Sequence, residues 1–115
     1  MTIGEISKAT HLPTSTLRYY EKKGLIRVSR DENNRRVYDK SDVAWIEFIN
    51  RLKETGMLLR DIQNYSELRY RGDETMAERL KILREHRKTV LNELEKWKSY
   101  LQNLDDKIKI YESAL

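Results

Sequence analysis

The chain has 115 residues, of which 37% are charged and 38% apolar, and its formal net charge is +4. The absence of cysteine excludes disulfides, thiolate metal sites and thiol redox sensing, and it fits a cytoplasmic protein. No apolar run is long enough to cross a membrane, and the N-terminus has no signal peptide, so no membrane partner is expected.

The positive charge is unevenly distributed along the chain. Residues 13–38 hold seven Lys or Arg against three Asp or Glu, whereas residues 57–115 hold twelve against eleven. A local basic patch is typical of nucleic-acid binding. Charge alone fits a solvated basic surface equally well, so the patch has to be interpreted together with the predicted elements.

Two short helices are predicted at the start of the chain. Thr2 and Glu5 form a capping-box pattern at the start of a helix over residues 2–10. Pro13 cannot continue that helix, and a second one is predicted from about Thr14 to Lys23. Two short helices joined by a tight turn form a helix-turn-helix, whose second helix enters the major groove of DNA.

A β-hairpin is predicted next, over about residues 26–38. Leu25–Val28 and Arg36–Tyr38 are the expected strands, and the polar segment Ser29–Arg35 joins them. A hairpin beside a helix-turn-helix forms a wing, and this one is rich in arginine.

Two more helices are predicted over about Ser41–Thr55 and Leu59–Arg69, separated by a break at Gly56. With the preceding elements they complete a predicted domain over residues 1–72. The expected fold is mainly α, a winged helix-turn-helix domain followed by a C-terminal dimerisation helix over residues 73–115.

The C-terminal segment carries a heptad seam from Met76 to Leu115, in which Arg87 is the only polar residue. At about 1.5 Å per residue this helix would span roughly 60 Å, too long to bury its stripe against a small domain, so it needs a second copy of itself. The predicted dimerisation residues are Leu80, Leu83, Val90, Leu94, Trp97, Leu101, Leu104 and Ile108.

The charges flanking the seam favour antiparallel pairing. The positions that follow each d residue change from basic Arg84 to acidic Asp105 and Glu112 along the helix. The bulky Trp97 and Tyr111 also fit poorly in a parallel dimer. The g positions on the other flank do not show the same gradient.

The N-terminal residues resemble the MerR family of bacterial transcription regulators. The resemblance covers about residues 2–75 and is carried by Ile3–Ile6, Thr16–Glu21, Gly24–Ile26 and Thr55–Met57. It implies a homodimer held by an antiparallel coiled coil, which binds an inverted repeat in double-stranded promoter DNA. It also implies activation by bending and untwisting the promoter, with RNA polymerase as a partner there.

Three departures from the family pattern bear on the site. Val28 replaces a common proline, Asn34-Arg35 replace a common Gly-Tyr pair in the wing, and Pro13 stands where many members have a capping serine. The segment at residues 71–75 is most similar to the branch linked to aldehyde stress and alcohol dehydrogenase. The sensing cysteine used by some of that branch is absent, so that mode of sensing cannot be transferred.

The candidate DNA contacts come from the second helix and the wing. Arg18 is expected to reach a guanine edge or a phosphate, or to pair with Glu21 or Glu5 instead. Of the adjacent tyrosines, one is expected to meet a phosphate while the other packs; Tyr19 is favoured for the DNA contact and Tyr20 for the core. Tyr38 is expected either to contact the DNA backbone or to brace the wing. The predicted set is Thr14, Ser15, Thr16, Arg18, Tyr19, Tyr20, Arg30, Arg35, Arg36 and Tyr38.

No enzymatic, metal or cofactor site is predicted. His11 and His86 have no second ligand at metal spacing, and the sequence contains no phosphate-binding glycine loop or catalytic triad pattern. A coiled-coil interaction module and an architectural or excisionase-like DNA binder are the alternatives to a MerR-type regulator. The sequence does not identify an effector.

Overall fold

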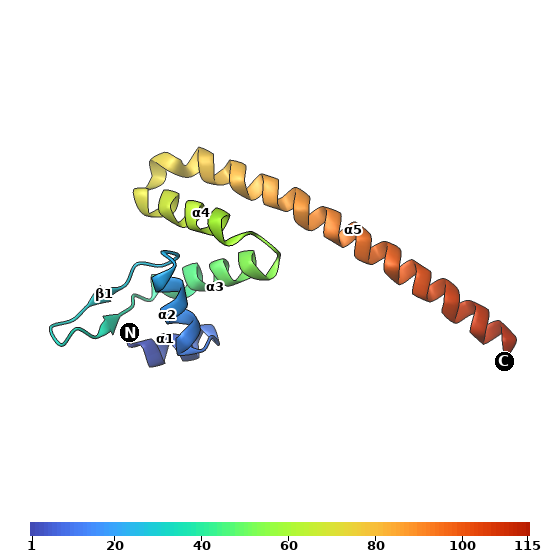
Figure 1. Ribbon diagram of the computed structural model, residues 1–115, viewed down its shortest axis with the longest axis horizontal. Coiled ribbons are helices and arrows are strands. Elements are labelled where there is room, and N and C mark those ends of the chain that lie inside the picture. The colour runs from blue at the N-terminus through green and yellow to red at the C-terminus, as the bar shows by residue number, and fades with distance from the viewer. The chain divides into compact units, whose positions relative to one another are not determined.

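The computed structural model describes residues 1–115, which form two compact units, Met1–Leu80 and Lys81–Leu115. The elements in chain order are helices α1 (Ile3–Thr10) and α2 (Thr14–Lys22), strands β1 (Ser29–Arg30) and β2 (Arg36–Val37), helices α3 (Ser41–Glu54) and α4 (Leu59–Arg71), the short 3₁₀ helix η1 (Asp73–Thr75), and α5 (Met76–Ala114) (Figure 1). The predicted winged helix-turn-helix and long C-terminal helix are confirmed.

The first helix begins at the predicted capping box. The Thr2 hydroxyl accepts a hydrogen bond from the Glu5 amide at 3.1 Å, and the Glu5 carboxylate accepts one from the Thr2 amide at 3.0 Å. These bonds satisfy amide groups that have no partner inside the helix. α1 ends at His11, which adopts the left-handed conformation, and Pro13 then precedes α2.

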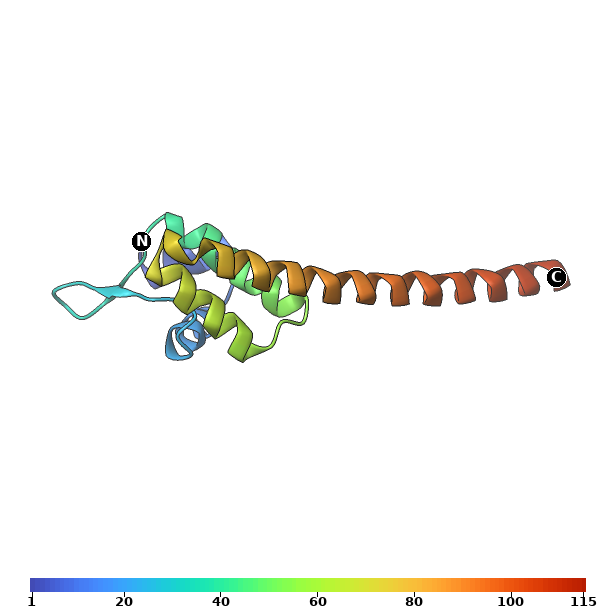
Figure 2. The ribbon, with the colours of Figure 1, turned by 90° about the horizontal axis from the view of Figure 1, so that it is seen from above.

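The first strand of the wing lies further along the chain than predicted. β1 is Ser29–Arg30, and it pairs antiparallel with β2 so that Arg30 faces Arg36. The predicted strand at Leu25–Val28 is wrong, because Leu25 and Ile26 are both buried and therefore do not alternate between two faces. Figures 1 and 2 show the hairpin loop extending away from the helices of the first unit.

The core of the first unit joins the wing to the helices. Trp45 on α3 stacks on Tyr65 of α4 at 5.8 Å between ring centroids, and its indole N–H donates to the Leu25 carbonyl at 3.2 Å. Ile46 and Ile49 are completely buried beside them. The segment after α2 is thus held by the packed face of α3 rather than by strand pairing.

The first compact unit extends past residue 72, where the sequence suggested a boundary. Gly72 has a φ of +113°, and Thr75 in η1 is buried. The Thr75 hydroxyl donates to the Leu68 carbonyl at 2.6 Å and lies 2.8 Å from the Gly72 carbonyl. These bonds attach the start of α5 to the end of α4.

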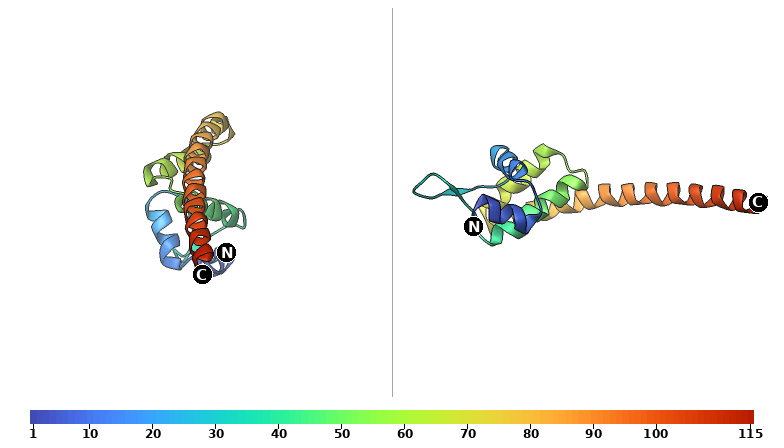
Figure 3. Two further views of the ribbon diagram at one scale, coloured as in Figure 1. Left: turned by 90° about the vertical axis from the view of Figure 1, so that its right-hand side faces the viewer. Right: turned by 90° about the horizontal axis from the view of Figure 1, so that it is seen from below.

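The second unit is the remainder of α5, which is a continuous helix (Figure 3). α5 contains no buried residue, and its seam is exposed except for the half-buried Leu83, with Trp97 at 66% and Leu101 at 58%. No helix of the protein is both long enough and apolar enough to span a membrane.

Candidate nucleic-acid interface

Helix α2 divides its side chains between the core and solvent. Leu17 and Tyr20 are completely buried, whereas Arg18 is exposed and Tyr19 is 40% exposed. Arg18 forms no ion pair, so the predicted alternative of a pair with Glu21 or Glu5 is not observed. A cation without an intramolecular partner on an exposed helix face is available to an external anion.

Glu21 connects α2 to both strands of the wing. One of its carboxylate oxygens lies 2.9 Å from Nη2 of Arg30, and the other lies 2.9 Å from Nε of Arg36. Because the β1–β2 register places the two arginines opposite each other, one carboxylate can hold both.

Burial corrects the prediction for Tyr20 and Tyr38. Both rings lie in the core, at 0% and 2% exposure, so neither is a surface contact in this structure. The Tyr20 hydroxyl donates to Oδ1 of Asn50 at 3.1 Å, which ties α2 to α3. Burial raises the pKa of Tyr20, and the nearby Glu54 carboxylate raises it further.

Tyr38 directly follows strand β2, and its side chain is buried. Its hydroxyl is buried without a hydrogen-bond partner, and burial raises its pKa, as does the charge of Glu21. Arg36, Arg30 and Arg18 act on the same hydroxyl in the opposite direction. Three of the predicted DNA-contacting arginines are therefore close enough to influence one buried phenol, which brings the wing cations and the recognition helix together.

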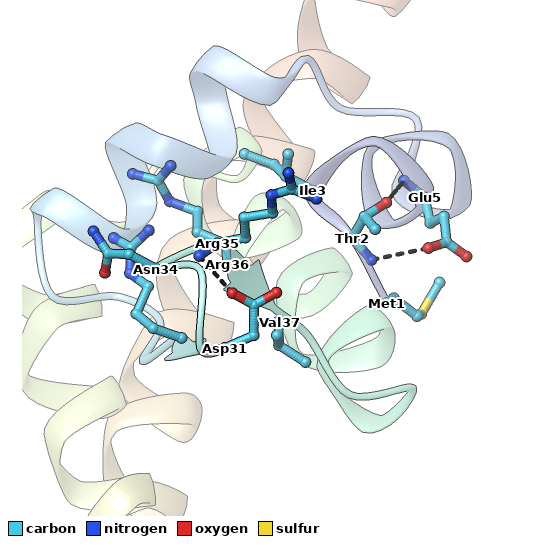
Figure 4. A pocket seen from close by; sticks show the side chains of 10 residues that line it. Met1, Thr2, Ile3, Glu5, Asp31, Asn34, Arg35, Arg36 and Val37 are labelled. Carbon is cyan, nitrogen blue, oxygen red and sulfur yellow. Dashed lines mark hydrogen bonds between the residues drawn. The ribbon is translucent and has the colours of Figure 1, made fainter.

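An open groove of about 520 Å³ lies between the wing and the start of α1 (Figure 4). Arg30, Arg35 and Arg36 contribute its positive charge, and Glu5 and Asp31 are its acidic residues. Asp31 is used within the wing, since its Oδ1 accepts hydrogen bonds from the Asn33 and Arg35 amides, each at 2.9 Å. The groove is an anion-attracting surface beside α2.

The hydroxyl residues at the start of α2 do not cap it. Pro13 occupies the N-cap position, and no side chain there makes a capping hydrogen bond. Ser15 is exposed, and Thr14 and Thr16 are partly exposed. Their hydroxyls are thus not used in capping α2.

Residues 1–68 match the family described as MerR HTH family regulatory protein, and residues 43–107 match the family MerR, DNA binding. The chain belongs to the MerR family of helix-turn-helix transcriptional regulators. The resemblance predicted from the sequence is confirmed, and the protein is a MerR-type transcriptional regulator.

Two bacterial regulators are similar to this chain over most of its length. It is 34% identical to an uncharacterised HTH-type transcriptional regulator of Haemophilus influenzae, over 98% of this chain and 84% of the relative. It is 37% identical to the regulator AdhR of Bacillus subtilis, over 79% of this chain and 66% of AdhR.

Solved structures agree with the fold. HiNmlR, a MerR family regulator lacking the sensor domain and bound to promoter DNA, is 34% identical with a TM-score of 0.85, covering 98% of this chain and 90% of HiNmlR. A putative regulator from Listeria monocytogenes has a TM-score of 0.92 at 29% identity, covering 97% of this chain and 86% of that one.

Glu21 and Lys53 belong to this surface although sequence reasoning did not select them. Lys53 of α3 lies 5.7 Å from the ring centroid of Tyr19, and Lys23 lies 5.8 Å from it. An acidic residue in a basic stretch is a signal that could have identified Glu21. Lys53 was not recognisable, because only the packing of α3 against the first two helices brings it to α2.

Proposed function

We propose that this MerR regulator binds an inverted repeat in double-stranded promoter DNA as a homodimer and changes transcription by distorting the promoter. The observation that carries the proposal is the arrangement around Glu21, which holds Arg30 and Arg36 of the wing against the helix that exposes Arg18. A major-groove helix and a flanking cationic wing are the two parts that a winged helix-turn-helix needs.

Within each half-site the residues have different roles. Arg18 reads a guanine edge or holds a phosphate, and the Tyr19 hydroxyl meets the backbone with the help of Lys23 and Lys53. Thr14, Ser15 and Thr16 offer hydroxyls and helix-start amides to a phosphate. Tyr20 and Tyr38 act from the core by fixing the positions of α2 and the wing.

The wing groove supplies contacts that do not depend on sequence. Arg35 is exposed and Arg36 is partly exposed, so their guanidinium groups are available to successive phosphates along one strand. Neutralising phosphates releases counterions, which makes the affinity fall with salt concentration. These contacts position the protein, while the recognition helix selects the sequence.

Two half-sites require two copies held at a fixed separation. The exposed apolar seam of α5 supports an antiparallel coiled coil through Leu80, Leu83, Val90, Leu94, Trp97, Leu101, Leu104 and Ile108. HiNmlR was solved on promoter DNA, which supports the same class of target here. RNA polymerase at the promoter is the further partner, and the cytoplasm is the compartment where both act.

The test is a mobility-shift series on DNA fragments selected from the host genome by the protein itself. Arg18→Ala should weaken specific binding by about 1–3 kcal/mol, because a charged contact to a base or phosphate is lost. Lys109→Ala is the matched control, since it removes the same charge from the exposed outer face of α5.

Sedimentation of the same samples separates DNA binding from dimerisation. Both variants should remain dimers, and only Arg18→Ala should lose affinity. Equal affinity of the Arg18→Ala variant and the parent would remove Arg18 from the interface.

A further inference from the structure

The a and d positions of the heptad seam allow an antiparallel pair only registers that differ by whole heptads. One of these registers is centred on Ser99, so that residue 87 of one copy lies opposite residue 111 of the other. In an antiparallel pair each a position faces a d position of the partner.

We propose that the α5 seam pairs with a second copy of this chain in one register, centred on Ser99, so that Arg87 packs on the partner's Tyr111. This inference rests on the antiparallel homodimer proposed above. It specifies which residues of the two copies meet.

Arg87 is the polar residue of the seam, and the register gives it a partner. Centred on Ser99, Arg87 lies in the layer of the partner's Tyr111, whose ring is 62% exposed in the single chain. A guanidinium over an aromatic face is attracted by the ring quadrupole. A parallel, in-register pair would instead place Arg87 against the partner's Arg87, where two like charges share a partly desolvated layer.

The remaining layers are apolar and complementary in size. Val90 faces the partner's Ile108, and Trp97 faces the partner's Leu101 on either side of the symmetry axis. The large indole is therefore placed against a leucine, not against a second indole. Both residues of this central layer are more than half exposed in the single chain, so pairing removes substantial apolar surface from water.

The charges beside the seam match in the same register. On the e side, Arg84 meets the partner's Glu112, and on the g side Glu93 meets the partner's Lys107. Because the dimer is symmetric, each of these ion pairs occurs two times. The two Lys98 residues approach each other across the axis, but each already has an ion pair with Glu95 of its own chain at 3.3 Å, which draws its ammonium group away.

Neighbouring registers lose these matches. A shift of one heptad toward the N-terminus still pairs Arg84 with an acidic residue, the partner's Asp105. It places Arg87 against the partner's leucine at position 104, however, and Lys107 beside the partner's His86. A shift of one heptad toward the C-terminus leaves Glu93 facing Ala114. Charge complementarity thus selects the register centred on Ser99.

Cysteine cross-linking tests the register directly, because the chain contains no cysteine. Tyr100 occupies a g position next to the axis, so two copies of a Tyr100→Cys variant should be joined by a short bifunctional maleimide. Glu93→Cys and Lys107→Cys are matched g-position controls. Neither should cross-link alone, and their mixture should give a covalent heterodimer.

The outcomes separate the register from the dimer. A covalent product from the mixture of Glu93→Cys and Tyr100→Cys chains, with none from Tyr100→Cys alone, would overturn the register in favour of the shift toward the N-terminus. A dimer by sedimentation that cross-links at none of these positions would overturn the register and leave the homodimer intact. A monomer at all concentrations would overturn both.

A charge exchange gives a second readout. Arg84→Glu and Glu112→Arg should each weaken dimerisation roughly tenfold, because each places like charges together at two symmetric sites. The double variant should recover to within about threefold of the parent, since it restores opposite charges. Lys109→Glu on the outer face is the control, and failure of the double variant to recover would contradict the pairing.

Discussion

The two compact units of this MerR regulator differ in where their stability comes from. The first buries aromatic and aliphatic side chains from α1 to α4, including Trp45, Ile46 and Tyr65, within one chain. The second buries none of its residues and exposes an apolar seam along one helix. The first unit therefore packs within one chain, whereas the second leaves an apolar face that is buried only in the proposed homodimer.

The comparison also distinguishes two kinds of charged residue. On α5 the ion pairs are exposed and local, such as Lys88–Glu85 and Lys96–Glu93, three residues apart on one helix. In the first unit Glu21 joins residues of the wing to a helix across nine and fifteen positions of sequence. Local pairs of the first kind contribute little to stability, while those around Glu21 position a surface.

The largest expected effect comes from placing a charge in the seam. Leu101→Asp should abolish dimerisation at micromolar concentration, because each copy would bury an unpaired carboxylate near the symmetry axis, at a cost of several kcal/mol. The first unit should keep its fold, since Leu101 is exposed in the single chain. Sedimentation and circular dichroism measure the two properties separately.

Lys109→Asp is the matched control, because it introduces the same carboxylate on the outer face of α5. It should remain a dimer. Loss of the fold of the first unit in Leu101→Asp would show that the two units are not independent in stability.

A smaller effect is expected at Glu21. Glu21→Gln removes the charge that holds Arg30 and Arg36, so the ratio of specific to non-specific DNA affinity should fall roughly threefold to tenfold. Unfolding free energy should change by less than about 1 kcal/mol, since all three side chains are partly exposed. Mobility shifts on operator and random DNA measure this ratio.

Glu47→Gln is the control for this variant. Glu47 pairs with Arg51 at 3.9 Å on the surface of α3, so its neutralisation should leave the ratio unchanged. If the ratio of specific to non-specific DNA affinity is unchanged in Glu21→Gln, Glu21 does not position the wing arginines for DNA binding.

The smallest effect contrasts the two buried tyrosines. Tyr20→Phe should cost about 1 kcal/mol of unfolding free energy, because it removes the hydrogen bond to Asn50. Tyr38→Phe should be close to neutral or slightly stabilising, because the hydroxyl it removes is buried without a partner. Denaturant titration measures the unfolding free energy of both variants. An equal loss of stability in the two variants would contradict the assignment of a hydrogen bond to Tyr20 and none to Tyr38.

The same tyrosines should affect stability at alkaline pH. Burial raises the pKa of both above 10, so the folded state keeps its phenol protons more tightly than the unfolded state does. Their contribution is fully present below pH 10 and declines as the pH rises above it. The decline should be shallower in Tyr38→Phe than in the parent.

The sequence predicted most of the elements because their signals are local. The capping box at Thr2 and Glu5, the break at Pro13 and the heptad seam each depend on residues a few positions apart, and all three appear where expected. The resemblance to the MerR family was equally visible, since its motif lies within a short stretch around Arg18.

The departures arise where distant residues meet. Leu25 and Ile26 form an apolar run that favoured a strand, but both are buried, and the Leu25 carbonyl accepts a hydrogen bond from Trp45 of α3 instead of pairing in a sheet. Tyr19 and Tyr20 are adjacent in sequence, and the fold assigned one to solvent and the other to the core. Local propensity cannot decide such cases, because burial depends on which elements pack together.

The sequence by itself determined the order of the helices, the presence of an arginine-rich wing, the family and the apolar seam of α5. Only the tertiary structure decided that Tyr38 is buried, that Lys53 approaches Tyr19, and that Glu21 connects Arg30 and Arg36 to α2. These contacts join residues separated by many positions, and their distances follow from packing rather than from any local sequence pattern.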